Sequence, residues 1–266
     1  MSGTPRVVLV TGAARGIGAA TVRRLRDRGD RVLAVDSCAG GAAGLPYPLA
    51  TREELDALVG EAGGGAEVVG HVADVRDRSA LADAVAAATD RWGRLDAVVA
   101  AAAVIAGGRP LWETTEAELD LLWGVDVRGV WNTAAVAVPA MLAGPDPSGC
   151  RFVALASAAG THGLHRLAGY SAAKHAVVGL VKGLAADLVG TGVTACAVSP
   201  GSTRTPMLDA TAALYGLDGV EEFAENQLLR RLLGPEEVAA TVAHCCTREA
   251  AVLNGTVVHA DGGFAP

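Results

Sequence analysis

The stretch that most constrains the fold is a glycine-rich turn directly after the first apolar run. Residues 6–11 (RVVLVT) are rich in β-branched side chains and of strand length, and glycines at 12, 16 and 18 then lead into a helical stretch at 17–28. Glycine lets the backbone approach a pyrophosphate closely, and the unpaired N–H groups at a helix start attract its charge. The opening therefore predicts a strand, a phosphate-binding turn and a helix of an α/β fold.

A carboxylate at the end of the next strand restricts which ligand can bind. The predicted strand 31–35 is followed by Asp36, at about the distance from Gly18 where a dinucleotide site places an acceptor for the ribose hydroxyls. Because a carboxylate would repel a 2′-phosphate, Asp36 favours NAD over its phosphorylated form. The alternative is an aspartate that caps a turn.

Strands and helices then alternate to the end of the chain. Such alternation is typical of a single-domain, Rossmann-type doubly wound parallel sheet with helices on both faces, and we expect about seven strands over residues 1–266. The predicted helix at 115–143 is the longest, and its residues Leu119, Leu122 and Trp123 are expected to face the core. Further strands are predicted at 67–72, 95–100, 151–156, 193–198 and 256–260, and helices at 51–62, 77–91, 115–143, around 170 to about 190, and 235–247.

Two segments interrupt this alternation. Residues 37–50 are rich in Gly and Pro, and they lengthen a connection that usually needs about 2–6 residues, so we expect an insertion. It is either a surface loop or a flap over the nucleotide, and Thr51 and Glu54 after it are expected to form a capping box. Residues 205–233 have helical patches without a clean period, and we expect them to form a lid over the substrate.

Composition excludes several function classes. A net charge of −7 argues against nucleic acid or an anionic membrane as the main partner. The five cysteines are odd in number and lack C-x-x-C spacing, which predicts neither a disulfide framework nor a metal site. The only early apolar run, residues 7–10, is too short for a signal-peptide core, and the charge-free stretch 129–145 contains Asn132 and two prolines and stops short of a membrane span. We therefore expect a soluble, cytoplasmic protein.

Tyr170 and Lys174 are the residues that most suggest chemistry. Four residues apart on a helix, they share one face, so the ammonium can lie beside the phenol. A nearby cation lowers the pKa of a phenol from about 10 toward working pH, which makes a tyrosine usable as an acid or base. Ser157 follows the strand 151–156, and a strand–loop–helix return can bring its hydroxyl beside Tyr170. This trio suits the interconversion of an alcohol and a ketone.

These pieces, in this order, resemble the short-chain dehydrogenase/reductase family along essentially the whole chain. The shared pieces are Thr11 to Gly18, Asp74-Val75, Ser157, Tyr170-x-x-x-Lys174, Pro200-Gly201 with Thr205, and Asp261-Gly262-Gly263. The resemblance implies that Tyr170 is the acid/base, Ser157 positions the substrate oxygen and Lys174 binds the nicotinamide ribose. His162 and His165 either line the substrate pocket or are merely exposed, and no metal is expected. The implied NAD-binding residues, besides Tyr170 and Lys174, are Gly12, Arg15, Gly16, Ile17, Gly18, Asp36, Asp74, Val75, Ala101, Ala102, Ala103, Pro200, Gly201, Thr203 and Thr205.

Two positions depart from the family pattern. Residues 100–103 are all alanine where the family usually has Asn-Asn-Ala-Gly, so side chains that tie neighbouring strands and border the cofactor are lost. Asp126 stands where the family usually has an asparagine of the catalytic relay. That asparagine is thought to hold a relay water through its main-chain carbonyl, a role Asp126 can keep, but its carboxylate can instead attract Lys174. We expect a less efficient proton relay rather than an inactive protein.

The insertion adds a finer resemblance. Residues 45–51 (LPYPLAT) and the alanine-rich segment that ends at 104–108 resemble the mycofactocin-coupled branch of the family. Members of that branch hold NAD so tightly that it does not exchange, and they pass electrons to a peptide-derived carrier. The resemblance implies that 37–50 covers the adenosine half of NAD and slows its release. The alternatives are an ordinary family member with freely exchanging NAD(H) and, suggested by the alanines and Asp126, a nucleotide-sensing protein without turnover.

The helix of Tyr170 carries two stripes. One extends the catalytic face onto the sheet, and it consists of Tyr170, Lys174, Val177, Val181, Leu184 and Leu188. The other contains small residues that let a second helix approach closely, namely Ala172, Ala176, Gly179 and Gly183. That second helix belongs either to the same subunit or to another copy. Because the family habitually pairs this helix across a two-fold axis, we expect a homodimer or homotetramer.

Overall fold

Seven parallel strands form one sheet in the computed structural model, which describes residues 5–43, 45–61 and 67–265. Their order is β3-β2-β1-β4-β5-β6-β7, so the direction of winding reverses between β1 and β4. In such sheets, ligands bind at the carboxyl ends of the strands near this reversal. The doubly wound fold predicted from the sequence is confirmed. The strands are β1 (Val7–Thr11), β2 (Arg31–Asp36), β3 (Val68–Val72), β4 (Ala97–Ala100), β5 (Arg151–Leu155), β6 (Thr194–Pro200) and β7 (Val257–Ala260).

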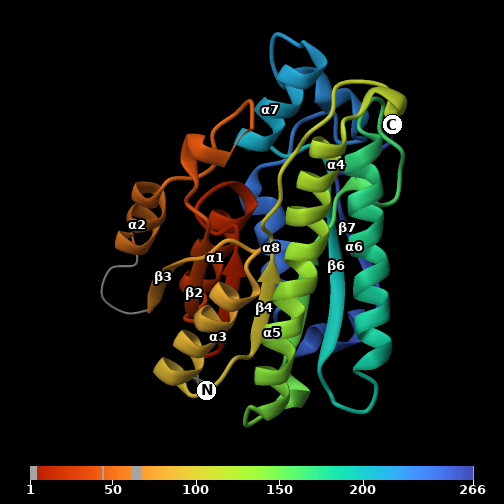
Figure 1. Cartoon of the computed structure of the whole chain (residues 1–266). Coiled ribbons are helices and arrows are strands. Elements are labelled where there is room, and N and C mark those ends of the chain that lie inside the picture. Colours follow the sequence, from red (N-terminus) through yellow and green to blue (C-terminus); the bar gives the residue numbers. More distant parts are fainter. Residues whose placement is uncertain (1–4, 44, 62–66, 266) are drawn as a thin grey trace.

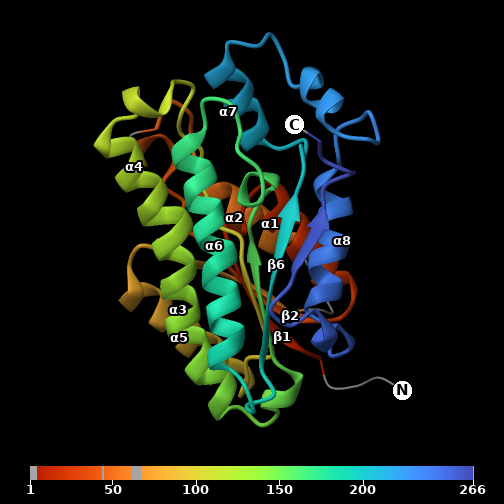
Figure 2. The same cartoon turned by 90° about the vertical axis from the view of Figure 1, so that its right-hand side faces the viewer.

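Helices cover both faces of the sheet (Figures 1 and 2). Successive strand residues point to opposite faces, so Val7 and Leu9 of β1 join one apolar cluster and Val8 and Val10 join the other. Burying each such side chain contributes roughly 1.5–3 kcal/mol. One face packs against α1 (Gly16–Asp27), α2 (Arg52–Gly60) and α8 (Pro235–Cys245), the other against α3 (Arg78–Trp92), α5 (Gly129–Ala143) and α6 (Ala168–Asp187).

The long helix predicted at 115–143 is interrupted. It consists of α4 (Glu116–Leu122), the π-helical turn η3 (Trp123–Arg128) and α5 in succession. Leu122 is buried as expected, but Leu119 and Trp123 are 43% and 42% exposed, so their predicted core position is wrong. The reason is that α4 packs against α6 rather than against the sheet, and this narrow contact covers Leu122 alone of the three. π-Turns of this kind often occur at functional sites.

The two predicted stripes of α6 have different surroundings. Lys174, Val177 and Val181 are buried against the sheet, whereas the small residues Gly179 and Gly183 are exposed. A Cβ added at either glycine would have no described atom within 4 Å. The small-residue stripe is therefore not covered by a helix from the described part of this chain.

The segments beyond the carboxyl ends of the strands are α7 (Pro206–Tyr215), η6 (Glu221–Asn226) and the insertion with its short turn η1 (Gly40–Ala43). Figure 1 shows α7 above the strand ends. Two backbone hydrogen bonds, between Gly40 and Ala50 and between Leu49 and Gly40, close the base of the insertion. The capping box of Thr51 and Glu54 is confirmed. Within the described ranges, no helix combines the length and apolarity needed to cross a bilayer.

Candidate active site

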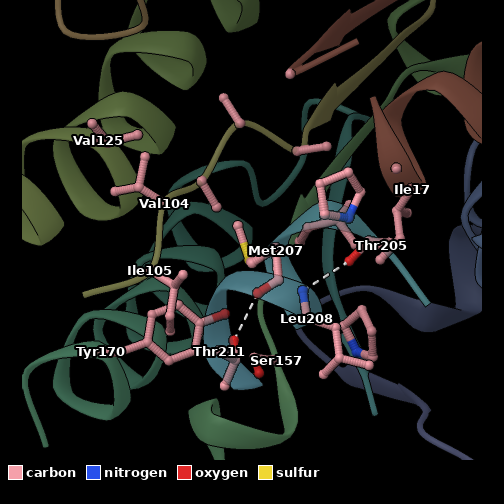
Figure 3. A pocket seen from close by; sticks show the side chains of 18 of the residues that line it. Ile17, Val104, Ile105, Val125, Ser157, Tyr170, Thr205, Met207, Leu208 and Thr211 are labelled. Atoms are coloured by element: carbon pink, nitrogen blue, oxygen red, sulfur yellow. Dashed lines mark hydrogen bonds between the residues drawn. The ribbon is translucent and has the colours of Figure 1, made fainter. Parts of the chain in front are cut away.

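A cavity of about 550 Å³ opens at the carboxyl ends of the strands. Its wall is formed by the glycine turn, the ends of β2 to β6, the insertion and α7, and Figure 3 shows side chains around it. Asp126 and His162 do not line it. The predicted site residues that do are Gly12, Arg15, Gly16, Ile17, Gly18, Asp36, Asp74, Val75, Ala101, Ala102, Ala103, Ser157, His165, Tyr170, Lys174, Pro200, Gly201, Thr203 and Thr205.

The glycine turn is shaped to admit an anion. Gly12 has a φ of +64° and a Cβ there would lie 2.7 Å from the backbone of Ala102, while a Cβ on Gly18 would lie 2.0 Å from the carbonyl oxygen of Gly12. Neither position can hold a larger residue without moving the backbone. Helix α1 then begins without a side-chain cap and without an acidic residue in its first turn. Its free N–H groups and dipole are therefore available to a phosphate.

Asp36 lies where β2 meets this turn. Its carboxylate accepts hydrogen bonds from the backbone N–H groups of Ala14 and Cys38, both at 3.1 Å, so it also serves the capping role considered as the alternative. Nearby, the guanidinium of Arg15 pairs with Glu54 at 2.7 Å and donates to the carbonyl of Pro48 at 3.1 Å. The cation beside the site is thus held by an acid, and the residues present fit NAD better than a nucleotide with a 2′-phosphate.

The alanine segment after β4 keeps a strand tie that the sequence suggested it had lost. The Thr11 hydroxyl, at the end of β1, accepts hydrogen bonds from the backbone N–H groups of Ala101 and Ala102 at 3.1 and 3.3 Å. Thr11 is 1% exposed, so these bonds are shielded from water. Thr11 belongs to the shared motif, but no role for its hydroxyl was predicted, because a threonine at the end of a β-branched run is ordinary for a strand.

Tyr170 and Lys174 are both buried on the sheet-facing side of α6. The Lys174 ammonium lies 5.6 Å from the centroid of the Tyr170 ring and donates to the carbonyl of Leu155 at 3.2 Å. Ser157 follows β5, and its hydroxyl accepts a hydrogen bond from the backbone N–H of Ala159 at 3.1 Å. Burial raises the pKa of Tyr170, whereas Lys174 and a hydrogen bond from Ser157 act in the opposite direction. Burial thus outweighs the lysine, contrary to the lowering expected from the sequence.

Asp126 lies behind this pair, in the π-turn, and is completely buried. One carboxylate oxygen accepts a hydrogen bond from the backbone N–H of Val104 at 2.9 Å, and the other lies 3.5 Å from the Lys174 nitrogen. Of the two roles considered, the carboxylate is therefore directed at the lysine. Burial raises the pKa of Asp126, with Lys174 opposing. Burial alone would lower the pKa of Lys174, but Asp126 and Tyr170 outweigh it and keep the ammonium protonated.

The insertion lies on the cavity wall. The Tyr47 hydroxyl accepts from the backbone N–H of Ile105 at 2.8 Å and donates to the Ile105 carbonyl at 3.2 Å. Leu45, Tyr47 and Leu49 join an apolar cluster that includes Ile105 and Tyr170. The segment was predicted to cover the adenosine half of NAD, and it runs along the cavity from beside Asp36 to the wall that contains Ile105 and Tyr170. Tyr47 carried no predicted role, although its place in a Pro-Tyr-Pro sequence set it apart.

The remaining wall is mostly apolar and comes largely from α7 and the chain after it. His165 lines the cavity, and its carbonyl accepts a hydrogen bond from the Tyr215 hydroxyl at 2.5 Å. His162 instead packs against the ring of Phe264, with centroids 5.7 Å apart, and is half-buried, so neither placement considered for it, in the pocket lining or merely exposed, is the observed one. The lining residues here that were not named from the sequence are Leu164, Met207, Leu208, Thr211, Tyr215, Phe223, Asn226 and Phe264, and those from Met207 to Asn226 fall within the segment 205–233 that was expected to form a lid.

A glycine turn after β1, an acid after β2 and a Ser–Tyr–Lys group after β5 define a class: dinucleotide-binding dehydrogenases and reductases. The family model described as enoyl-(acyl carrier protein) reductase matches residues 12–265. The chain is 36% identical to an uncharacterized oxidoreductase of Mycobacterium tuberculosis. The match extends over 272 residues and covers 97% of this chain and 96% of that relative. The chain belongs to the short-chain dehydrogenase/reductase family.

Two solved structures are similar over nearly their whole length. The crystal structure of levodione reductase has a TM-score of 0.87 and 32% identity, with 98% of each chain covered. The sequence comparison matches a levodione reductase of Leifsonia aquatica at 33% identity, over 98% of this chain and 94% of that protein. Carveol dehydrogenase from Mycobacterium avium, solved in complex with NAD, has a TM-score of 0.89 and 28% identity, covering 97% and 96%.

Proposed function

We propose that this protein is an NAD-dependent oxidoreductase that interconverts a secondary alcohol and a ketone. The observation that carries the proposal is one cavity that joins the glycine turn and Asp36 to Ser157, Tyr170 and Lys174. Bound NAD would supply the hydride acceptor or donor. Tyr170 exchanges the hydroxyl proton of the substrate, and Ser157 positions the substrate oxygen. The ammonium of Lys174 holds a positive charge beside the tyrosine. The relatives named levodione reductase and carveol dehydrogenase support this reaction class.

The substrate end of the cavity favours a compact apolar molecule. Met207 and Leu208 of α7 face this space together with Ile105 (Figure 3). Besides Ser157 and Tyr170, two hydroxyls on this part of the lining are already bonded to backbone, since Thr211 donates to the carbonyl of Met207 at 2.7 Å and Tyr215 to that of His165 at 2.5 Å. Such a pocket binds by apolar burial and orients its ligand through a few polar groups.

The insertion supports a finer proposal, namely that NAD is held so tightly that a mycofactocin-type carrier, rather than exchange, reoxidises it. It is anchored to two other parts of the cavity lining, since Tyr47 binds Ile105 and the Pro48 carbonyl accepts from Arg15. Release of the nucleotide past this segment would require these bonds to open. The alternative remains an ordinary family member with exchanging NAD(H).

The uncovered small-residue stripe of α6 supports a homodimer or homotetramer. Gly179 and Gly183 leave space for another helix to approach closely, and Trp131 of α5 is 62% exposed. Burying such a surface against a second copy would be favourable.

One measurement tests the reaction and the tight binding together. The absorbance spectrum of the purified protein is recorded before and after addition of a panel of secondary alcohols, without added cofactor. A new reduced-nicotinamide band, limited to one turnover per subunit, is expected. Protein that purifies without nucleotide and turns over normally with added NAD would contradict tight binding but not the oxidoreductase proposal. No turnover under either condition would contradict both.

A further inference from the structure

The strongest unexplained feature is a carboxylate where this family usually has a neutral amide. Asp126 is 0% exposed, and its oxygen Oδ2 has no well-aligned hydrogen bond within the described part of the chain. That oxygen lies 3.5 Å from the Lys174 nitrogen, and Lys174 is itself 2% exposed. A buried charge without such a partner would be costly. The arrangement therefore places an anion directly behind the cation that serves the catalytic tyrosine.

Among the described residues, few other ionisable groups lie near Asp126 and Lys174. Helix α6 brings Lys174 and Tyr170, and the insertion brings Tyr47, whose hydroxyl is bound by Ile105. The segment 101–108, which packs over the π-turn, contributes backbone and apolar side chains. From β5 the Leu155 carbonyl accepts from Lys174, and the neutral Ser157 hydroxyl follows. Among the described residues, Lys174 is thus the cation that faces both Asp126 and Tyr170.

We propose that Asp126 is a positioning residue that partly neutralises Lys174 and thereby keeps Tyr170 in its protonated, phenol form over a wider pH range than an asparagine would. The inference rests on the proposed function. The carboxylate holds the ammonium toward the π-turn, so less of its charge stabilises a phenolate. The opposing actions of Lys174 and Asp126 on the pKa of Tyr170 agree with this geometry.

The consequence differs for the two reaction directions. In ketone reduction, the O–H bond of Tyr170 breaks and its proton goes to the substrate oxygen, and reduced nicotinamide, when bound, would supply the hydride with its electron pair. This step needs the phenol. Alcohol oxidation is the reverse and needs the phenolate to take the hydroxyl proton. Asp126 therefore makes the protein active as a ketone reductase over a broad pH range and restricts alcohol oxidation to higher pH.

The direct test measures the ionisation of Tyr170 itself. The chain has three tyrosines, so protein labelled with ¹³C at tyrosine Cζ gives three NMR signals, which Tyr47→Phe and Tyr215→Phe assign. In Asp126→Asn, the amide oxygen can still accept the hydrogen bond from Val104. The pH at which half of Tyr170 is ionised, its titration midpoint, is expected to fall by about one pH unit, which is the effect of one partly screened charge at this range. Asp120→Asn removes a charge from the exposed face of α4 and is expected to leave the midpoint unchanged.

Kinetics give a second readout. In the pH profile of kcat/KM for alcohol oxidation, the rising limb should shift to lower pH by about one unit in Asp126→Asn. At a pH below the midpoint, oxidation therefore becomes about tenfold faster. An unchanged Tyr170 midpoint, or slower oxidation, would overturn the proposal. Should Asp126→Asn not fold, Asp126→Ser, which also removes the charge, takes its place, and an unchanged Tyr170 midpoint in that variant would equally refute the proposal. The NMR result stands even if no substrate turns over, which separates this inference from the proposed function.

Discussion

Replacing Tyr47 by phenylalanine tests whether the insertion controls release of the nucleotide. The substitution removes one hydroxyl that makes two hydrogen bonds with the backbone of Ile105. Ile105 is 2% exposed, so water would not readily replace them. Each bond contributes about 1 kcal/mol net, and their joint loss should favour the open insertion by about 2 kcal/mol. This free energy corresponds to a roughly 30-fold larger open population.

The expected result is release of reduced NAD about 30-fold faster than in the parent. Release is followed by the fluorescence of bound reduced nicotinamide while an excess of another dehydrogenase traps the free nucleotide. The phenyl ring stays in the apolar cluster with Leu45 and Leu49, so the fold should be retained. Tyr215→Phe is the matched control, since it removes another hydroxyl of the cavity wall, the one bound to the His165 carbonyl. It should change the KM for the alcohol rather than nucleotide release.

An unchanged release rate in folded Tyr47→Phe would refute the reasoning. It would mean that the insertion opens without breaking the contact with Ile105, or that the nucleotide leaves by another route. Equal acceleration by Tyr215→Phe would point instead to general loosening of the cavity.

Three further outcomes follow from the structure. Tyr170→Phe should lower turnover by about 10²–10⁴-fold with NAD binding retained in calorimetry; unchanged biological activity would favour the nucleotide-sensing alternative. Gly18→Ala should abolish NAD-dependent thermal stabilisation, because its Cβ would lie 2.0 Å from the Gly12 carbonyl oxygen, and normal stabilisation would contradict the placement of the phosphate. Gly179→Trp should reduce the mass in light scattering to that of a monomer; an unchanged oligomer would exclude α6 as the contact, and a parent that is already monomeric would exclude the proposed assembly.

The sequence predicted most of the sheet and the polar positions at its edge. Its strands are short β-branched runs between turn residues, and the residues that end or directly follow these strands are the ones that resemble the family. Because the carboxyl ends of parallel strands share one edge, Gly12, Asp36 and Ser157 were expected together, and all three line the cavity. These features depend on local spacing and on one rule of topology, so the sequence was sufficient.

The long helix and His162 show where local spacing fails. A periodic apolar pattern assigns a face but does not say what covers it, and at Leu119 and Trp123 nothing in the described chain buries the side chain fully. Similarly, the position of His162 two residues beyond a short helical turn does not reveal that Phe264, from the far end of the chain, lies against it.

The sequence by itself determined the fold class and the family, and it predicted which residues carry a proton or hold a nucleotide, because each depends on residue type and spacing along one or two elements. The tertiary structure alone decided how those residues affect one another. It directs Asp126 at Lys174 across two helical elements, and it joins Tyr47 to the wall that contains Ile105, far along the chain. Burial and distance between segments remote in sequence set charge and hydrogen bonding at the site, and neither is encoded in a local pattern.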